Sequence, residues 1–157
     1  MMFRELLTSY GPALRRLARA YCGNPFDQQD LFQEIAVAVW SGLDRFRGES
    51  SERTWIYRIA HNVALTFQGK QRRLEAREQP IQERAAVPDM DHDQRRELLE
   101  MVRRLPSIDR QLMLLHLEGL TGPEIAEVTG LTSSNIGVRL MRARQRMIDE
   151  VKAKETR

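Results

Sequence analysis

The chain of 157 residues contains a single cysteine, Cys22, and only three histidines. One thiol cannot form an intramolecular disulfide, so the disulfide scaffolds of small secreted domains are excluded. Cys22 lies at the end of an apolar pattern and is expected to be a packed thiol in a reducing compartment. The sequence has no paired Cys or His spacing of the zinc-binding kind, so we expect neither a metal site nor a cofactor.

The sequence also lacks a glycine-rich phosphate loop and a nucleophile with an adjacent base. Its serines cluster where turns are predicted, and its histidines are scattered. No residue is therefore expected to be catalytic, and the chain is not predicted to be an enzyme.

Long hydrophobic runs are missing as well. The apolar run from Ile35 to Leu43 carries no charge, but it is far shorter than the roughly 20 residues that a membrane-spanning helix needs. Arg4 and Glu5 follow the first three residues directly, which leaves no apolar core for a signal peptide. We expect a cytoplasmic protein without membrane insertion. Its net charge of +3 permits a nucleic-acid partner without requiring one.

The clearest pattern that the chain does contain lies between residues 120 and 146, where the signals for two helices and a tight turn occur in order. Thr121 and Glu124 have the spacing of a capping box at the start of the first helix. Gly130 is the type of residue that ends a helix in a left-handed conformation. Thr132 can cap the second helix. The stretch is therefore predicted to be a helix-turn-helix.

The second helix of this motif carries positive charge on one flank. Arginines recur there at helical spacing, and no acidic residue occurs between Glu127 and Asp149. A merely solvated helix usually mixes both signs, so this pattern favours DNA, with arginines on phosphates and small polar residues at the helix start on base edges. The apolar stripe predicted to pack inward is Ile136, Leu140, Ala143 and Met147. The expected contacts with upstream DNA are Thr121, Thr132, Ser133, Ser134, Asn135, Val138, Arg139, Arg142 and Arg146.

An ordinary helical hairpin with a basic surface is the alternative interpretation of this motif. The caps at both helix starts and the one-signed charge favour the DNA-binding interpretation over it.

The first half of the chain is predicted to consist of three helices. The first covers residues 3–22, with Gly11-Pro12 as an expected bend or fresh start. A loop of glycine, serine and alternating charge occupies residues 42–51. A long third helix is expected from residue 52 to residue 79.

The second of these helices opens at Asn24-Pro25, which reads as a cap and a first turn. Acids near a helix start, such as Asp27 and Asp30, are explained by the helix macrodipole. Glu34 lies further along and is not explained in this way. The core face of this helix is predicted to be Leu31, Ile35, Ala38 and Val39.

The third helix interleaves aromatic residues with arginines around Trp55 and Tyr57. Such a pattern suits a single-stranded nucleic acid, because bases stack on the rings for roughly 1–3 kcal/mol each while cations follow the backbone. Alternatively, Trp55 and Tyr57 are aromatic residues at the edge of the core with polar tips at the surface. Spacing alone does not choose between these interpretations. The packing stripe is predicted to be Ile56, Ile59, Ala60, Val63 and Phe67.

The helical periodicity fails over residues 80–93, which are predicted to be a flexible linker between two lobes, residues 1–79 and 94–157. Acids at the spacing of a calcium-binding EF-hand loop occur here, namely Asp89, Asp91, Asp93 and Glu100. The position that needs glycine for the sharp turn is Gln94 instead, so calcium binding is not expected.

The second lobe is expected to begin with a helix over residues 94–105, and Ser107 can cap the helix that follows. His116 is expected to be a hydrogen-bonded structural histidine. The fold class predicted for the whole chain is therefore all-α, with two small helical lobes.

In this order, the two lobes resemble regions 2 and 4 of a bacterial RNA polymerase sigma factor of the extracytoplasmic-function group of the sigma-70 family. DLFQEIAVAVW, residues 30–40, resembles the helix by which the family docks on the polymerase clamp. FRGESSERTWIYRIAHNVA, residues 46–64, resembles its promoter-melting and minus-ten-reading segment. Residues 105–144 resemble its minus-thirty-five-binding helix-turn-helix. Together these segments cover most of the chain.

This resemblance implies roles and partners. The polymerase-binding residues would be Asp30, Gln33, Glu34, Val37 and Trp40, which gives the acid in mid-helix a task. The residues that melt the promoter and capture minus-ten bases would be Phe46, Arg47, Ser50, Arg53, Trp55, Tyr57, Arg58 and Asn62. The implied partners are core RNA polymerase, promoter DNA, and an anti-sigma factor or other inhibitory protein.

Two residues depart from the family's pattern. Glu52 stands where the family usually has an apolar or aromatic residue, which places an acid near DNA. Gly137 stands where many members carry lysine on the recognition helix, which removes one contact. Asn135 and Gly137 also weaken that helix by propensity.

Two other functions stay open at the level of sequence. One is a two-domain helix-turn-helix regulator that does not associate with polymerase. It would need the same second lobe, but it would leave the polar face of residues 30–40 without a function. A protein-interaction module or anti-activator that reuses the fold is the other.

Overall fold

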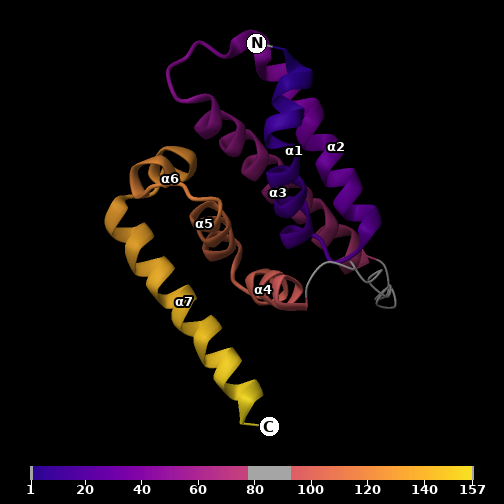
Figure 1. Ribbon diagram of the computed structural model, residues 1–157. Helices are drawn as coiled ribbons and strands as arrows, with labels where there is room; N and C mark the ends of the chain where they lie inside the picture. The colour runs from indigo at the N-terminus through magenta and orange to yellow at the C-terminus, as the bar shows by residue number, and fades with distance from the viewer. Residues whose placement is uncertain (1, 78–92, 157) are drawn as a thin grey trace. The chain divides into compact units, whose positions relative to one another are not determined.

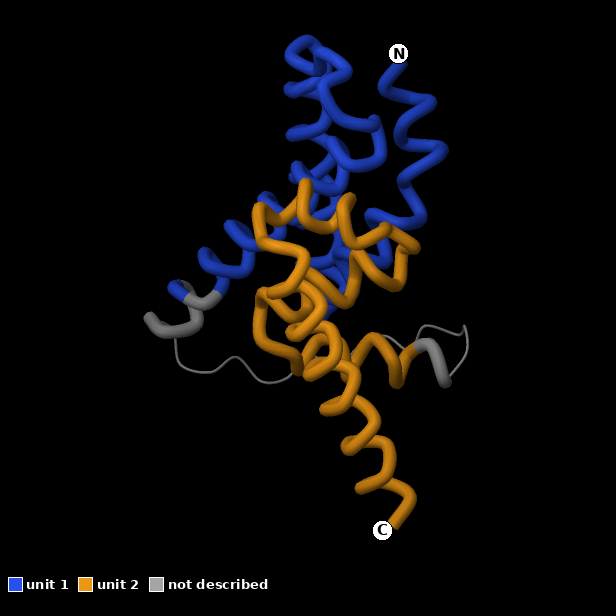
Figure 2. The backbone as a smooth tube through the Cα atoms, turned by 90° about the vertical axis from the view of Figure 1, so that its left-hand side faces the viewer, with its two compact units in different colours: residues 1–90 blue, residues 91–157 orange. Residues whose placement is uncertain are grey.

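The computed structural model describes residues 2–77 and 93–156 (Figure 1). These residues form seven α-helices and one short 3₁₀-helix, and no β-strand occurs among them. The prediction of an all-α fold is confirmed. The chain divides into two compact units, residues 1–90 and 91–157, which are blue and orange in Figure 2. Apart from Asp93, the predicted linker lies outside the described residues, as do two acids of the EF-hand-like spacing, Asp89 and Asp91.

In the first unit, α2 (Pro25–Gly42) packs against both α1 (Phe3–Tyr21) and α3 (Glu52–Arg77), and the 3₁₀-helix η1 (Leu43–Arg45) follows α2 directly (Figure 1). The side chains buried between the helices include Leu6, Leu14, Leu17, Leu31, Ile35, Val39, Ile56, Ala60 and Phe67. Each fully buried Leu, Ile or Val contributes about 1.5–3 kcal/mol, so packing of these faces, more than helix propensity, stabilises the unit.

The predicted core face of α2 is borne out in most positions. Leu31, Ile35 and Val39 are buried, whereas Ala38 is only half-buried. Because this face turns inward, the residues between its members point outward along the helix.

The starts of α2 and α3 are fixed by side-chain caps. The Asn24 side chain accepts a hydrogen bond from the Asp27 N–H at 2.9 Å, as the sequence predicted. Ser51 Oγ accepts from the Thr54 N–H at 3.1 Å and donates to Thr54 Oγ1 at 2.9 Å. Ser51 was predicted to lie in the loop, so this second cap was not predicted from the sequence.

A fresh helix start at Gly11-Pro12, one of the two expected outcomes, does not occur, because α1 runs through both residues without interruption. Pro12 is exposed, so its ring meets solvent and not a neighbouring helix. Leucines on either side of it, Leu6 and Leu14, are buried and hold the helix against the core, which offsets the roughly 3 kcal/mol that an internal proline costs.

In the second unit, α7 (Ser133–Glu155) packs against α5 (Ser107–Leu117) and α6 (Gly122–Thr129) and also contacts α4 (Asp93–Arg103). In the predicted inward stripe of α7, Ile136 and Ala143 are buried, while Leu140 and Met147 are half-buried. The buried core includes Val102, Leu105, Leu112, Leu115, Ile125, Val128, Ile136 and Ala143.

The helix-turn-helix signals are confirmed one by one. Thr121 Oγ1 accepts from the Glu124 N–H at 3.3 Å, and the Thr121 N–H donates to Glu124 Oε1 at 3.0 Å, which completes the capping box. Gly130 ends α6 with a left-handed φ of 76°. Thr132 Oγ1 accepts from the Asn135 N–H at 3.2 Å at the start of α7.

The prediction that Ser107 caps α5 is wrong. Ser107 is the first helical residue, and Pro106 occupies the N-cap position without a side-chain hydrogen bond. The helix begins one residue earlier than predicted because the Pro106 carbonyl already accepts from the Arg110 N–H at 2.8 Å. None of the described helices combines the length and the apolar character that crossing a membrane requires.

Candidate binding surfaces

One face of α2 points away from the core of the first unit. Asp30, Gln33 and Glu34 are exposed on it. Two large apolar side chains continue the face, with Val37 61% and Trp40 63% exposed. All five residues that the resemblance assigned to polymerase binding therefore lie on one helix and are accessible. Exposed large apolar groups beside carboxylates have the composition of a protein interface, with an apolar centre and a polar rim.

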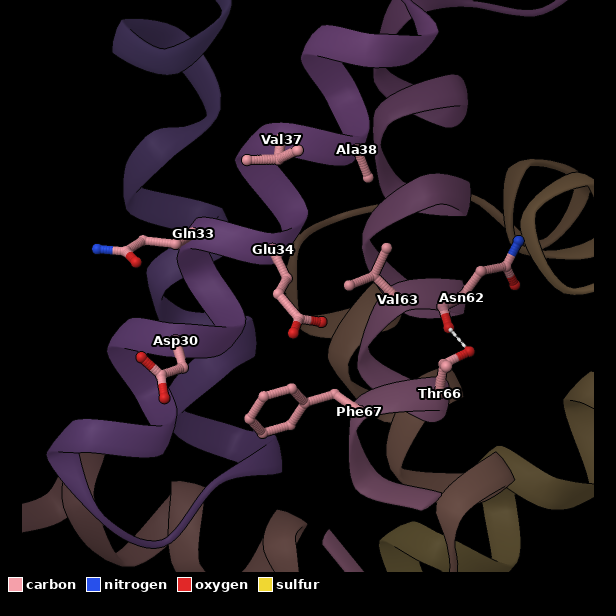
Figure 3. Close-up of a pocket in the computed structure, with 9 residues that line it drawn as sticks. All are labelled: Asp30, Gln33, Glu34, Val37, Ala38, Asn62, Val63, Thr66 and Phe67. Carbon is pink, nitrogen blue, oxygen red and sulfur yellow. Dashed lines mark hydrogen bonds between the residues drawn. The ribbon is translucent and has the colours of Figure 1, made fainter. Parts of the chain in front are cut away.

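A groove of about 700 Å³ lies between α2 and α3. In Figure 3 the Glu34 carboxylate points from α2 towards Val63 and Phe67 of α3, whereas Gln33 points away from it. The α3 side of the groove was missed by the sequence analysis, because the spacing of Val63 and Phe67 indicated only core packing. The groove is lined by Asp30, Gln33, Glu34, Val37, Ala38, Asn62, Val63, Thr66 and Phe67.

The loop before α3 presents an aromatic pair next to a cation. Phe46 is half-buried, and its ring centroid lies 4.9 Å from that of Trp55 at an interplanar angle of 38°. Arg47, the next residue of the chain, is exposed. Gly48 has a φ of 74°, a left-handed conformation that favours glycine and so fixes the turn of this loop. A ring that a base can stack on, with a cation next to it, is what a single-stranded nucleic acid requires.

Along α3, the residues predicted to meet melted DNA differ in exposure. Asn62 is exposed. Trp55 is half-buried, so the edge of the aromatic pair reaches the surface. Arg53 and Arg58 are half-buried too, as is Ser50 in the loop that precedes α3.

Tyr57 is the exception, because it is buried although the resemblance placed it among the residues that capture minus-ten bases. Only 4% of Tyr57 is exposed, and its ring packs edge-on against Tyr10 with centroids 6.5 Å apart. His61, one turn further along, is 1% exposed and shares a 3.2 Å hydrogen bond with the Tyr21 hydroxyl. The predicted stripe was too narrow because α3 packs against α1 as well as α2. Tyr57 is therefore a packed core residue, more deeply buried than the position at the edge of the core that the alternative interpretation gave it.

The charges of this core follow from burial. Burial lowers the pKa of His61 from 6.5 to about 3, so the imidazole is neutral. Burial also raises the pKa of Tyr10, with further contributions from the charge of Glu52 and a hydrogen bond to it. Glu52, the acid that departs from the family's pattern, therefore has an internal partner in α1.

The basic helix α7 presents most of its predicted DNA contacts to solvent. Arg142 and Arg146 are exposed, and so is Val138, at 41%. The N-cap of α6, Thr121, is exposed, and so are the N-cap and the first three residues of α7, namely Thr132, Ser133, Ser134 and Asn135. Of the predicted set, only Arg139 is half-buried.

Arg139 is held by two neighbours. Its terminal nitrogen donates to Asp109 Oδ1 at 3.1 Å, and its Nε donates to Asn135 Oδ1 at 2.9 Å. Asp109 lies 30 positions earlier, in the first turn of α5, and no local pattern in the sequence could have paired the two. The hydrogen-bonded state expected for His116 is present, since its Nε2 lies 3.3 Å from an Arg144 guanidinium nitrogen.

Comparison with known protein families gives two matches. Residues 6–74 match sigma-70 region 2, and residues 95–147 match sigma-70 region 4. The two matched segments fall in the two compact units in the same order as the surfaces described above.

Three relatives are similar over most of their length. The chain is 31% identical over 130 residues to the RNA polymerase sigma factor YlaC of Bacillus subtilis (strain 168), covering 74% of this chain and 72% of YlaC. It is 28% identical over 138 residues to the RNA polymerase sigma factor SigV of the same strain, covering 87% and 83%. It is 26% identical over 165 residues to the ECF RNA polymerase sigma-E factor of Haemophilus influenzae, covering 95% and 87%.

Two solved structures share the fold. CnrH in complex with the cytosolic domain of CnrY is 25% identical, with a TM-score of 0.72 over 96% of this chain and 88% of CnrH. The sigma factor RpoE of Bartonella quintana, in complex with the anti-sigma factor NepR, has a TM-score of 0.80 at 23% identity, covering 96% of both chains. With region 2 and region 4 matched in order and relatives similar over most of their length, the chain belongs to the extracytoplasmic-function group of the sigma-70 family of RNA polymerase sigma factors.

Proposed function

We propose that this sigma factor divides its task between its two units, residues 1–79 and 94–157, with residues 80–93 as the linker. The first binds core RNA polymerase and captures melted bases, and the second reads an upstream promoter element. The observation that carries the proposal is the exposed face of α2, where carboxylates and two large apolar side chains lie together opposite a packed core face.

The polymerase-binding part rests on Glu34, Val37 and Trp40. An acidic residue in the middle of a helix is too far from the N-terminus to be stabilised by the helix dipole. The apolar side chains of Val37 and Trp40 are exposed to water in the isolated chain. Burying those side chains under a partner would recover about 25 cal/mol for each Å² of apolar surface. The groove between α2 and α3 gives that partner a concave seat with Glu34 at its centre.

The melting part rests on the pair of Phe46 and Trp55 and on Arg47. Unstacking a base costs a few kcal/mol, and an aromatic surface with an adjacent cation offsets part of that cost. The pair is preformed in the isolated chain, so little ordering is needed when the base arrives.

The upstream part rests on α7. Its N-terminal residues are exposed, capped and free of acids, and Arg142 and Arg146 follow on the same helix. This is the arrangement in which a recognition helix enters the major groove with arginines on the flanking phosphates. Because both units belong to one chain, each contact raises the effective concentration of the other, and neither needs to be tight alone.

A protein inhibitor is proposed as a further partner. The sigma factor RpoE of Bartonella quintana, which has a similar fold, has been solved with the anti-sigma factor NepR bound, and CnrH has been solved with the cytosolic domain of CnrY bound. Exposed apolar groups such as Val37 and Trp40 offer an inhibitor the same interface that they offer the polymerase.

The test replaces Glu34→Lys and measures co-elution with purified core polymerase on a sizing column. We expect at least a tenfold weaker complex, because the lysine places a cation against a polymerase surface that is complementary to a carboxylate. Glu5→Lys is the matched control, since Glu5 is also an exposed acid of the first unit but does not line the groove. If both variants co-elute like the unchanged chain, the α2 face is not the polymerase site.

A further inference from the structure

Asn135 occupies a position from which a recognition helix reads bases. It is the third residue of α7, exposed, and its backbone N–H is already used by the Thr132 cap. Its side chain is exposed, and the amide oxygen accepts a hydrogen bond from Arg139 Nε at 2.9 Å. The following inference rests on the proposed reading of upstream DNA by α7.

The orientation of the Asn135 amide is fixed by chemistry. A guanidinium only donates hydrogen bonds, so the atom that lies 2.9 Å from Arg139 Nε must be the amide oxygen. The amide nitrogen then points away from Arg139, and it has no partner among the residues that the structure describes. A flip of the amide would place two donors face to face.

Arg139 is itself held in place from a different helix. Its terminal nitrogen donates to Asp109 at 3.1 Å, and the side chain of Asp109 is only 14% exposed. A charge-assisted hydrogen bond to a largely buried carboxylate restrains the guanidinium more than a solvent-exposed pair does. The three side chains thus form a chain of contacts from α5 to the start of α7.

This chain of contacts changes what Asn135 can recognise. An asparagine usually reads adenine by donating to N7 and accepting from the N6 amino group. Here the amide oxygen accepts a hydrogen bond from the Arg139 cation, and the positive charge repels a second donor that approaches this oxygen. The same hydrogen bond polarises the amide group and makes its N–H groups stronger donors. Guanine presents two acceptors in the major groove, N7 and O6, whereas cytosine presents a donor.

We propose that Asn135 is a specificity-determining residue that favours guanine and disfavours cytosine at one position of the upstream element, and that Asp109 and Arg139 are the positioning residues that make it a donor. Asp109 acts without touching DNA. The proposal assigns a base-reading effect to a residue of α5, outside the helix-turn-helix.

The experiment uses the full chain with core polymerase on a set of promoters in which every base pair of the upstream element is changed in turn, and transcript yield is the readout. Asn135→Ala is expected to lose discrimination at one base pair, by about fivefold or more, which is the lower end for a base-edge contact. Yields at the other positions keep their relative order. The base preferred by the unchanged chain at that pair is guanine on the strand that Asn135 meets.

Asp109→Ala tests the positioning role. It is expected to shrink discrimination at the same base pair, and the double variant with Asn135→Ala is expected to be no worse there than Asn135→Ala alone. Asp149→Ala is the matched control, because Asp149 is another acid of the same unit that hydrogen-bonds Gln145 and not Arg139. Asp109→Asn, which keeps the shape of the side chain, is the second variant if thermal unfolding shows that Asp109→Ala is not folded.

Two results would overturn the proposal. One is a preference for adenine over guanine at the base pair affected by Asn135→Ala, since both bases offer the N7 acceptor and a gain from the adenine N6 amino group requires the amide oxygen to accept. The other is a loss with Asp109→Ala that is equal at all positions or matched by Asp149→Ala, since that is a general electrostatic effect. If the unchanged chain shows no base preference anywhere in the upstream element, the proposed reading by α7 itself fails, which is a distinct outcome.

Discussion

The most unusual single residue of the first unit is His61, a histidine with almost no exposed surface in the middle of a helical core. Its ring accepts or donates one hydrogen bond with the Tyr21 hydroxyl at 3.2 Å and lies at a tilt to Tyr57, 6.5 Å between centroids. The neutral ring fits this site because one of its nitrogens has a hydrogen-bond partner and the ring lies next to the aromatic rings of Tyr21 and Tyr57. Charging it would place a cation in an apolar interior.

Stability of the chain is therefore expected to depend on the protonation of His61. The pKa of His61 is about 3 in the folded state, below the 6.5 of the unfolded chain, so unfolding takes up a proton between these values. Its contribution to stability is complete above pH 6.5 and is lost as the pH falls towards 3, at a rate of at most about 1.4 kcal/mol per pH unit.

Urea unfolding at pH 7 and pH 5 measures this contribution. The free energy of unfolding should fall more over that interval for the unchanged chain than for His61→Gln, which cannot titrate but keeps a polar group near Tyr21. Equal losses for the two proteins would show that the carboxylates, and not His61, govern the acid sensitivity.

Gly137 is a second residue with a measurable consequence. It lies exposed in α7, and a Cβ there would meet nothing within 4 Å. Gly137→Ala is therefore expected to stabilise the chain by up to about 1 kcal/mol, because alanine loses less backbone entropy in a helix. Gly130→Ala is the contrasting variant, since its φ of 76° strains any side chain and should lower the melting temperature. A melting temperature of Gly137→Ala at or below that of the unchanged chain contradicts this account.

At the scale of elements, the end of α2 and the start of α3 are fitted to each other at Gly42. A Cβ at this position would lie 3.1 Å from Trp55 Cζ2 and 3.5 Å from Ile59 Cδ1. Because Gly42 has no side chain, the Trp55 ring can occupy a position in which it also contacts Phe46. The geometry of the aromatic pair therefore depends on a glycine in the preceding helix.

Gly42→Ala is expected to displace Trp55 and slow promoter opening by up to about tenfold, equivalent to about 1.4 kcal/mol, while co-elution with core polymerase is unchanged. Permanganate reactivity of unpaired thymines measures the opening. Gly69→Ala is the control, since Gly69 lies exposed in α3 and a Cβ there would meet nothing within 4 Å. If Gly42→Ala opens the promoter at the normal rate, the geometry of the aromatic pair does not govern promoter melting.

The arginines of α7 are expected to determine how promoter binding depends on salt concentration. Arg142 and Arg146 are exposed on the flank proposed to meet phosphates, whereas Arg144 contacts His116. Arg142→Ala should weaken promoter binding by the holoenzyme and reduce the slope of log affinity against log salt by about 1. Arg144→Ala is expected to leave the slope unchanged. A slope that responds to Arg144 and not to Arg142 would place the phosphates on the other flank.

Taken over the whole molecule, the parts that could be predicted from the sequence are those set by local chemistry. The caps at Asn24, Thr121 and Thr132 and the left-handed end at Gly130 depend on residues within one turn, and the structure confirms them. The burial of Tyr57 was not predictable, because it depends on where α1 packs on α3.

The candidate surfaces divide in the same way. The exposed face of α2 follows from the periodicity of one helix, and the five residues assigned to it are all accessible. The groove between α2 and α3 and the pairing of Asp109 with Arg139 join residues far apart in the chain. Such contacts are set by the packing of helices, and no spacing rule within a single helix contains them.

The central claim is that one chain both engages the polymerase and selects the promoter. The most direct measurement is transcription by purified core polymerase on a library of random upstream sequences, with and without the chain. The account predicts new transcript start sites that require the chain, share a common upstream element, and disappear with Glu34→Lys. Chain-dependent binding to that element without any new start site would contradict it and leave a DNA-binding protein that does not direct the polymerase.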